Sequence, residues 1–296
     1  MADLHITKNY GWKYKWKPYE DDIIKKYYPN GGAGMVIEFL PNREKHAIQS
    51  RAFRLGVKYL SYDKDYFEKI DTPAKAYWLG FLYADGYTTT GNRWGLQLQH
   101  QDKLHLEKFA HAFSYNGKIR DRVQNGKQNS SILINNKKMC NDLKGLGVIN
   151  NKTAILTFPN ANILPERLQP HFIRGFFDGD GCITWSNKPR VRSDRNGKIS
   201  NRMVKEVNII GVSKGFIDAI YVILQHHNIK MNYTVTKRKG CLDIYVLRTS
   251  KLDTIQSFYN YIYRDADAEI MLSRKFDKFN SLLSATNSSD AILKIS

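Results

Sequence analysis

The chain has 296 residues, about twice the length of a typical single domain, which predicts two or three compact units. Hydrophobic residues make up 42% and charged residues 25%, which are ordinary values for a globular protein and exclude a disordered or collagen-like chain. There is no apolar run of the roughly 18 residues that a membrane helix needs, and no secretory signal. The three separated cysteines do not match a disulfide framework or a zinc site. We therefore expect a cytoplasmic protein of a phage or its bacterial host.

The charge is the most informative number. Lys and Arg total 46 against 28 Asp and Glu, a net charge of +18. Such an excess predicts a polyanionic partner, usually nucleic acid. A solvated basic surface and a patch for acidic membranes are the alternatives. Nucleic acid is preferred because no basic amphipathic helix of membrane-binding length stands out.

Residues 1–60 are expected to form a small domain of three short helices, followed by a charged linker over 61–71. Pro18 suits a first helical position, and the run PNGG at 29–32 should end that helix. A second helix is expected over 33–40, and a third from Arg43 to about Leu55. Asn42 is the expected N-cap of the third helix, and Gly56 can end it.

The third helix has two contrasting faces. Ile48, Ala52 and Leu55 share one face at 100° per residue, and the polar or basic residues lie roughly opposite: Arg43, His46, Ser50 and Arg54. Such a helix fits a DNA major groove, although a small bundle with a solvated face is equally compatible with the pattern. The segment from Trp16 to Gly56 resembles the Myb/SANT-like helix-turn-helix often fused to phage and mobile-element nucleases.

The rest of the chain contains an internal duplication, with one copy over 72–165 and the other over 166–296. Each copy opens with a proline near the start of a helix that ends in Asp-Gly: AYWLGFLYADG at 76–86 and HFIRGFFDGDG at 171–181. Strands are then expected near 93–99, 118–124 and 130–135, and in the second copy near 183–191, 203–212, 233–237 and 242–247. Helices are expected over 103–113, 137–146, 214–228 and 251–261. This order predicts an α+β fold of two αββαββα halves with antiparallel sheets.

The two Asp-Gly helices carry the candidate chemistry. Gly80 and Ala84 share one face of the first helix, and Gly175 and Gly179 match them in the second. Small residues at this spacing let two helix backbones approach closely. If the helices pack side by side, the carboxylates of Asp85 and Asp180 meet at their ends.

Two carboxylates at negative helix ends repel each other. Either one takes a proton or a hard cation lies between them, and oxygen ligands beside a phosphodiester favour Mg²⁺. The alternative is that Ala-Asp-Gly and Asp-Gly-Asp-Gly are ordinary turn residues. A single copy would favour that alternative, but two copies in a chain of charge +18 favour a site.

The segments WLGFLYADG at 78–86 and IRGFFDGDG at 173–181 resemble the paired motifs of LAGLIDADG homing endonucleases, and the resemblance covers about residues 72–280. Two motifs in one chain imply the monomeric form, with saddle-shaped sheets that lie in the DNA major groove. By motif position, Asp85 and Asp180 correspond to the metal-binding catalytic acids, and the carbonyls of Ala84 and Gly179 to further metal ligands. Tyr83 departs from an acidic position of the motif that Asp178 keeps.

The resemblance also implies a basic residue, usually lysine, beside each active site. Lys152 and Lys275 fit those places and could orient the attacking water or stabilise the charge of the transition state. With 46 basic residues in the chain, a lysine near the right position is weaker evidence than the aspartates.

Alternating polar residues on the expected strands are candidates for reading DNA. One-sided sets of this kind are Arg93, Gln97 and Gln99; Lys118, Arg120 and Arg122; Arg190 and Arg192; and Thr234, Thr236 and Arg238. Arginine can read guanine and glutamine can read adenine. The alternative is that they contact phosphate, which positions a protein without specifying sequence, and we expect this of about half.

Taken with this resemblance, the sequence predicts a site-specific, Mg²⁺-dependent double-strand DNA endonuclease that acts as a monomer. The resemblance implies cleavage with short 3′ overhangs and a role in the mobility of its own gene or an intron. Two rivals retain the same basic sheets: an RNA maturase that binds intron RNA, and a DNA-binding protein with an inactive site.

Overall fold

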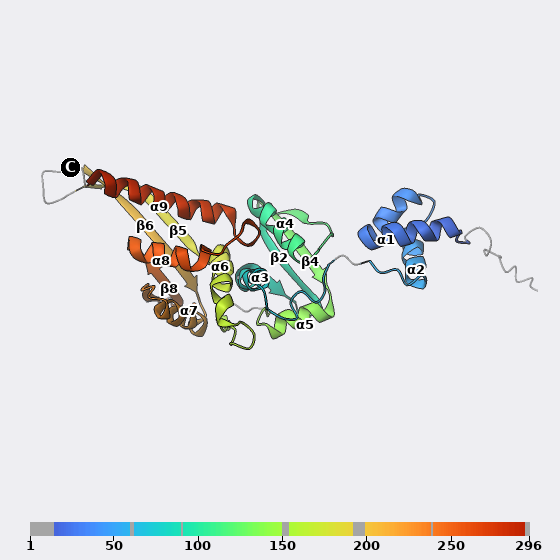
Figure 1. Cartoon of the computed structure of the whole chain (residues 1–296), viewed down its shortest axis with the longest axis horizontal. Coiled ribbons are helices and arrows are strands. Elements are labelled where there is room, and N and C mark those ends of the chain that lie inside the picture. Colours follow the sequence, from blue (N-terminus) through green and yellow to red (C-terminus); the bar gives the residue numbers. More distant parts are fainter. Residues whose placement is uncertain are drawn as a thin grey trace, which may run out of the picture. The chain divides into compact units, whose positions relative to one another are not determined.

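The structure is a computed structural model that describes residues 15–59, 62–89, 91–149, 154–191, 199–237 and 239–293. It divides into two compact units (Figure 1): residues up to 63 with 113–118, and residues 64–112 with 119 onward. Three predicted site residues, Lys152, Arg192 and Arg238, lie outside the described residues.

The smaller unit contains α1 (Pro18–Phe39) and α2 (Lys45–Arg54). The expected break in α1 is a kink at Gly32, whose φ of 60° and ψ of −158° are readily adopted only by glycine. The helix nevertheless continues through Pro29. The expected N-cap at Asn42 is wrong, because α2 begins after Glu44. Gly56, with φ +68°, lies just beyond the end of α2, as expected for a C-terminal glycine.

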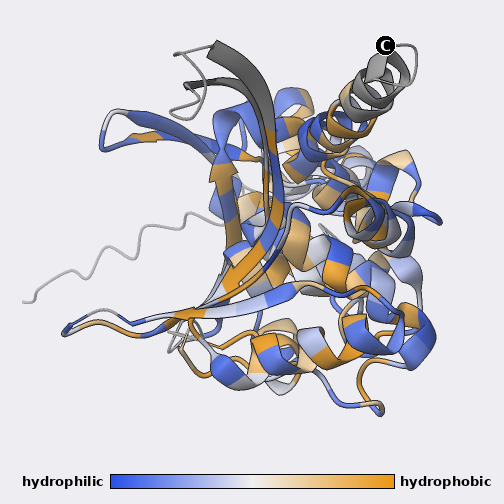
Figure 2. Ribbon diagram, turned by 90° about the vertical axis from the view of Figure 1, so that its left-hand side faces the viewer, coloured by the Kyte–Doolittle hydropathy of each residue, from blue (hydrophilic) through white to orange (hydrophobic). Residues whose placement is uncertain are grey.

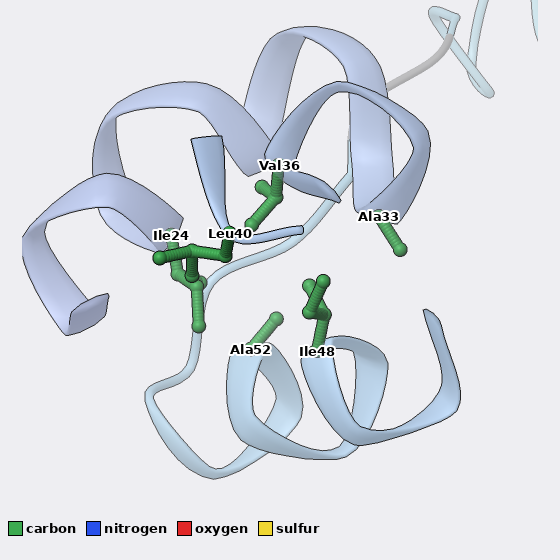
Figure 3. Packing of buried hydrophobic residues seen from close by; sticks show 6 residues of the cluster. All are labelled: Ile24, Ala33, Val36, Leu40, Ile48 and Ala52. Carbon is green, nitrogen blue, oxygen red and sulfur yellow. The ribbon is translucent and has the colours of Figure 1, made fainter. Parts of the chain in front are cut away.

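An apolar core holds the two segments of α1 against α2. It consists of Ile24, Ala33, Val36, Leu40, Ile48 and Ala52, which are buried and point toward one another (Figure 3). Ile48 and Ala52 are four residues apart and so extend from one face of α2. The apolar face predicted for this helix is therefore its packed face.

The first half of the larger unit runs through α3 (Pro73–Asp85), β1 (Gly86–Thr88), β2 (Arg93–Gln99), α4 (Lys103–Ala112), β3 (Arg120–Gln124), β4 (Lys127–Asn135) and α5 (Lys137–Gly145). Its sheet is antiparallel, in the order β1-β2-β4-β3. The first strand directly after the motif helix was not predicted, because three residues are too few to show an alternating pattern.

The second half repeats the order with α6 (Gln169–Asp180), β5 (Cys182–Val191), β6 (Ile199–Gly211), α7 (Lys214–His226), β7 (Asn232–Thr236), β8 (Ile244–Thr249) and α8 (Leu252–Tyr263). Its antiparallel sheet has the equivalent order β5-β6-β8-β7. A further helix, α9 (Ser273–Leu293), follows. The predicted α+β fold of two αββαββα halves is confirmed.

Each sheet has one face packed under helices, and its long strands are visibly curved (Figure 2). Strand β2 alternates between buried residues such as Trp94, Leu96 and Leu98 and exposed polar ones. Helices α4 and α5 contact the first sheet, and α7 the second. The alternation means that every second residue of a strand lies on the uncovered face.

Residues 64–71 differ from the expected linker. Phe67 and Ile70 are buried, and the Phe67 ring packs edge-on against Trp94, with 6.1 Å between ring centroids. Because the apolar residues in this segment are few and separated by charges, periodicity gave no signal for burial. The segment belongs to the core of the larger unit.

Across the described ranges, we find no helix that combines the length and apolar character required to cross a membrane.

Candidate active site and nucleic-acid interface

Helices α3 and α6 lie side by side at the middle of the larger unit (Figure 1) and make its most extensive helix–helix contact. Glycine makes the close approach possible. A Cβ atom at Gly175 would lie 1.9 Å from the Tyr77 carbonyl oxygen, and one at Gly80 would lie 2.0 Å from that of Phe172. Both distances are far inside van der Waals contact, so no other residue fits without separating the helices. The pairing inferred from the repeated small residues is present.

The two helices end together at Asp85 and Asp180, both of which are exposed. The Asp85 Oδ2 atom lies 3.2 Å from the position that a Cβ of Gly179 would occupy. The Asp85 carboxylate therefore lies over the last turn of α6, next to Asp180. The chain brings two acids to one solvent-accessible point at the seam between its halves.

The glycines after the two aspartates are needed for space. Gly86 and Gly181 have φ values of −75° and −71°, which any residue can adopt, so they do not end the helices through a left-handed conformation. A Cβ at Gly86 would lie 2.7 Å from the Leu82 carbonyl oxygen, and one at Gly181 would lie 2.6 Å from that of Phe177. The chain turns so tightly into the strand that only glycine fits.

Lys275, from α9, reaches the end of α6. Its ammonium group donates to the carbonyl oxygens of Phe177 (2.6 Å), Gly179 (3.1 Å) and Gly181 (2.6 Å). Three acceptors use all three ammonium hydrogens, and the positive charge lies at the negative end of the helix. The ammonium group therefore binds backbone, and the direct catalytic role expected for Lys275 would require it to leave these partners.

The positive charge of Lys275 interacts electrostatically with both Asp85 and Asp180. Burial lowers the pKa of Lys275 to about 8, since only 6% of the residue is exposed. The negative charges of Asp178, Asp180 and Asp85 act against this shift, and that of Asp178 contributes most. The carboxylates of Asp85 and Asp180 are therefore both close enough to stabilise the same buried ammonium ion.

The donor set at the seam fits a hard divalent cation. Two carboxylates and adjacent backbone carbonyls are the oxygen ligands that Mg²⁺ accepts, and this ion usually keeps waters and adds substrate phosphates. The Gly179 carbonyl, one of the expected ligands, already accepts a hydrogen bond from Lys275. Within the described ranges, no cluster of three or more His, Cys, Asp or Glu residues offers a cation an all-protein cage.

The two motif copies differ at Tyr83 and Asp178. Tyr83 is buried and donates to the Leu146 carbonyl oxygen at 2.6 Å. Asp178 is fully buried and accepts from Tyr77 (2.8 Å), Tyr263 (2.5 Å) and the Leu272 backbone N–H (2.8 Å). Both residues fasten a motif helix to a neighbouring segment, so the motif tolerates either an acceptor or a donor there. Burial raises the pKa of Asp178, while its hydrogen bonds act to lower it.

The hydrogen bonds to Asp178 continue across the seam to His105. Since Tyr77 donates its single hydroxyl hydrogen to Asp178, it accepts from His105 Nε2, which is 2.9 Å away. Nδ1 of His105 has no hydrogen-bond partner among the described residues. The ring is therefore held neutral, with the proton on Nε2. Burial lowers the pKa of His105 to about 3.

This histidine predicts sensitivity to acid. The folded pKa of about 3 lies below the ordinary histidine pKa of 6.5, so between these two pH values the unfolded chain binds one more proton than the folded chain. The free energy of unfolding is therefore not reduced by His105 above pH 6.5, and it falls by about 1.4 kcal/mol for each pH unit as the pH drops from 6.5 toward 3. In the His105→Gln variant, which keeps a side-chain donor, we expect a flatter dependence of the melting temperature on pH. Parallel curves for the two proteins would contradict this assignment.

The uncovered face of the first sheet is cationic. Arg93, Gln97 and Gln99 of β2 are exposed there, as predicted. The register aligns Gln99, Asn129 and Arg122 across three strands, and likewise Gln97, Ser131 and Arg120. Lys118 is exposed but precedes the strand. The expected alternation is therefore correct within the strands, and β4 adds Lys127 and Asn129, which were missed because its first three residues are all polar.

Tyr87 is a further candidate on this face. It pairs with Gly95 across the two strands, and its hydroxyl oxygen lies 2.8 Å from where a Cβ of Gly95 would be. The missing side chain thus leaves room for the tyrosine ring on the sheet surface. Tyr87 was not among the predicted site residues because strand β1 was not predicted.

The uncovered face of the second sheet is more mixed. Thr234 and Thr236 lie there on β7, as expected, and the register places Asn232 next to Arg248, and Arg248 next to Asn208. Glu206 adds a carboxylate, which accepts from Asn208 at 3.1 Å. Arg190 occupies the same face by its register with Ser200 on β6, although its side chain lies outside the described set. Among the side chains that the structure describes on this face, the positive charge comes from Arg248.

The smaller unit places Arg43 differently from the prediction. Its guanidinium group binds both carboxylate oxygens of Glu20, at 2.8 and 2.7 Å, and lies over the ring of Trp16. Only 13% of the Arg43 side chain is exposed. The assignment of Arg43 to a free DNA-contacting face is therefore wrong. The guanidinium nitrogens that would contact DNA are hydrogen-bonded to Glu20, 23 positions earlier in the chain. His46, Ser50 and Arg54 are exposed on α2, as expected.

Replacing Arg43 with alanine is expected to destabilise the smaller unit by about 3 kcal/mol, because Glu20 would remain buried without its partner. Arg43 is also the largest cause of the lowered pKa of Glu20. The measurement is the chemical denaturation of the full chain, followed by the exchange of backbone amide hydrogens in α1 and α2, because the five tryptophans of the chain do not report on the smaller unit alone. Ser50→Ala is the control and should leave the transition in place. Equal transitions for both variants would show that the pair contributes little.

The fold and the seam together define a protein of two pseudo-symmetric α+β halves that joins two acidic helix ends between basic or mixed sheet faces. Residues 168–263, which lie within the second half of the chain, match the family model for the LAGLIDADG-like domain. The first half repeats its order of elements and its Asp-Gly helix end. No curated protein matches the chain.

Solved structures similar to this chain include three DNA-bound LAGLIDADG proteins. The meganuclease I-AabMI with uncleaved DNA is 14% identical, with 74% of this chain and 92% of the other covered and a TM-score of 0.48. The homing endonuclease I-LtrWI with target DNA is 13% identical, with 77% and 92% covered and a TM-score of 0.46. The meganuclease I-CpaMI with uncleaved DNA is 14% identical, with 74% and 93% covered and a TM-score of 0.48.

Proposed function

We propose that this protein is a site-specific endonuclease that cuts both strands of duplex DNA at the seam between its two halves. The observation that carries the proposal is the meeting of Asp85 and Asp180 at an exposed point, flanked by uncovered sheet faces. Two carboxylates held close together at the ends of two helices repel each other. Such repulsion is useful where a cation and a phosphodiester are to be bound.

The described residues of the seam have two tasks in this proposal. Asp85 and Asp180 supply the negative charge that draws a divalent cation to the scissile phosphates. Lys275 holds the last turn of α6 in place through the carbonyls of Phe177, Gly179 and Gly181, which makes it a positioning residue. A bound Mg²⁺ would activate water and neutralise the developing charge on the phosphate oxygens. The predicted role of Lys152, to orient the attacking water or stabilise the charge of the transition state, stays a prediction, since this residue lies outside the described ranges.

The sheets would hold and read the DNA. The first sheet presents Arg93, Arg120, Arg122 and Lys127 on its uncovered face, and these cations fit the phosphates and guanine edges of a duplex. Glutamine side chains at 97 and 99 can read adenine. The smaller unit, with α2, would contact DNA beside the central site and raise the affinity by tethering.

Incubation of the full chain with a genomic or random-site DNA library, with and without Mg²⁺, tests the proposal. The expected result is discrete double-strand cleavage at one sequence only when Mg²⁺ is present. Tight, metal-independent binding to a structured intron RNA without cutting would favour a maturase. Sequence-specific DNA binding without cutting in any divalent metal would favour an inactive regulator of the same fold.

A further inference from the structure

An exposed phenylalanine lies on the outward face of α2. Phe53 is 86% exposed, more than any other large hydrophobic side chain among the described residues. Helix α2 buries Ile48 and Ala52 against α1, and at 100° per residue Phe53 lies on the opposite side with His46 and Ser50. Folding of the smaller unit therefore does not explain this ring.

The surroundings of Phe53 fit a polyanion. Helix α2 contains Lys45, Arg51 and Arg54 but no acidic residue. Between residues 15 and 59 the chain has nine Lys or Arg and five Asp or Glu, so the net charge is 9 − 5 = +4. Two of those basic residues and two of the acids neutralise each other in internal pairs, which leaves the excess positive charge on the surface.

Two ion pairs fix which face of α2 points outward. Arg51 binds both carboxylate oxygens of Asp21, at 2.7 and 2.6 Å, and Arg43, just before α2, binds Glu20 in the same way. Both acids belong to the first turn of α1. Bidentate pairs of this kind restrict rotation of the helix about its axis. His46, Gln49, Ser50 and Phe53 are consequently held as one outward row.

We propose that Phe53 is a base-reading residue, whose ring packs against the 5-methyl group of a thymine in the major groove beside the cleavage site. An α-helix fits this groove, where the thymine methyl is the apolar group that a phenylalanine can contact. Gln49, one turn earlier on the row, has the amide that pairs with adenine. This inference rests on the proposed DNA-binding role of the smaller unit and predicts an A·T-containing flank in the recognised sequence.

The test combines a protein change with a DNA change. Full-length protein selects its duplex from a random-sequence library, without divalent metal so that no cutting occurs. Each thymine of the selected flank is then replaced by uracil, which removes only the methyl group. At one position we expect this replacement to weaken binding about fourfold for the native chain and not at all for Phe53→Ala.

Tyr19→Ala is the matched control, since Tyr19 is an exposed aromatic residue (55%) on α1, and it should keep the full response to uracil. The proposal is overturned if Phe53→Ala leaves the selected flank unchanged, weakens all sequences equally, or responds to uracil as the native chain does. The proposed nuclease is judged separately, by Mg²⁺-dependent cutting of the central site, which Phe53→Ala should retain at high protein concentration. Loss of cutting in the native chain would therefore not affect the uracil result.

Discussion

Asp180→Asn and Asp85→Asn are each expected to reduce the formation of linear product from a plasmid carrying the target site by at least about 10²–10³-fold. Asparagine keeps the shape of the side chain but removes the charge that would attract a divalent cation between the helix ends. DNA affinity should be unchanged or higher, because a negative charge near the phosphates is lost. The measurement pairs a cleavage time course with binding in the absence of metal.

The melting temperature of the same two variants is a second measurement that tests this prediction. Both carboxylates lie at the negative ends of helices, where a negative charge costs about 0.3–1 kcal/mol. This cost is offset by the attraction of each carboxylate to the Lys275 ammonium ion, so each single substitution should leave the melting temperature nearly unchanged while it reduces cutting. Asp253→Asn is the control, because Asp253 is exposed in the first turn of α8, and it should leave cleavage intact. If both motif variants cut DNA as well as the native chain does, the active site is not at the seam.

Gly175→Ala is expected to destabilise the larger unit by about 3 kcal/mol or more, at the upper end for overpacked cores. The added methyl group would lie 1.9 Å from the Tyr77 carbonyl oxygen and 2.8 Å from the Phe81 nitrogen. Both are backbone atoms of α3, so relief requires the two helices to separate. The measurement is the free energy of unfolding in urea for the full chain.

Gly215→Ala provides the contrast. Gly215 lies in the first turn of α7, and a Cβ there would meet nothing within 4 Å. Alanine in a helix is favoured over glycine by about 0.5–1 kcal/mol, so this variant should be as stable as the native chain or more so. If the two alanine variants unfold at the same urea concentration, the close packing of α3 on α6 is not what holds the halves together.

The fold could be predicted largely from local patterns. Alternation along residues 93–99 and the repeated helix that ends in Asp-Gly were both visible in the sequence, and the structure has them at almost the expected bounds. Strand β1 and helix α9 were missed. The former is too short to show a period. The latter buries Phe279, Leu282 and Leu283 at helical spacing, a periodicity that the sequence reading did not use.

The sequence by itself determined the duplication, the two acids at equivalent helix ends and the surplus of positive charge, since each is written in residues close together in the chain. Only the tertiary structure decided which charged side chains are available to contact DNA or to take part in catalysis. Arg43 is occupied by Glu20, 23 residues away, and Lys275 is bound to backbone 94–98 residues away. Such pairings depend on which segments pack together in space, and periodicity over a few residues carries no information about them.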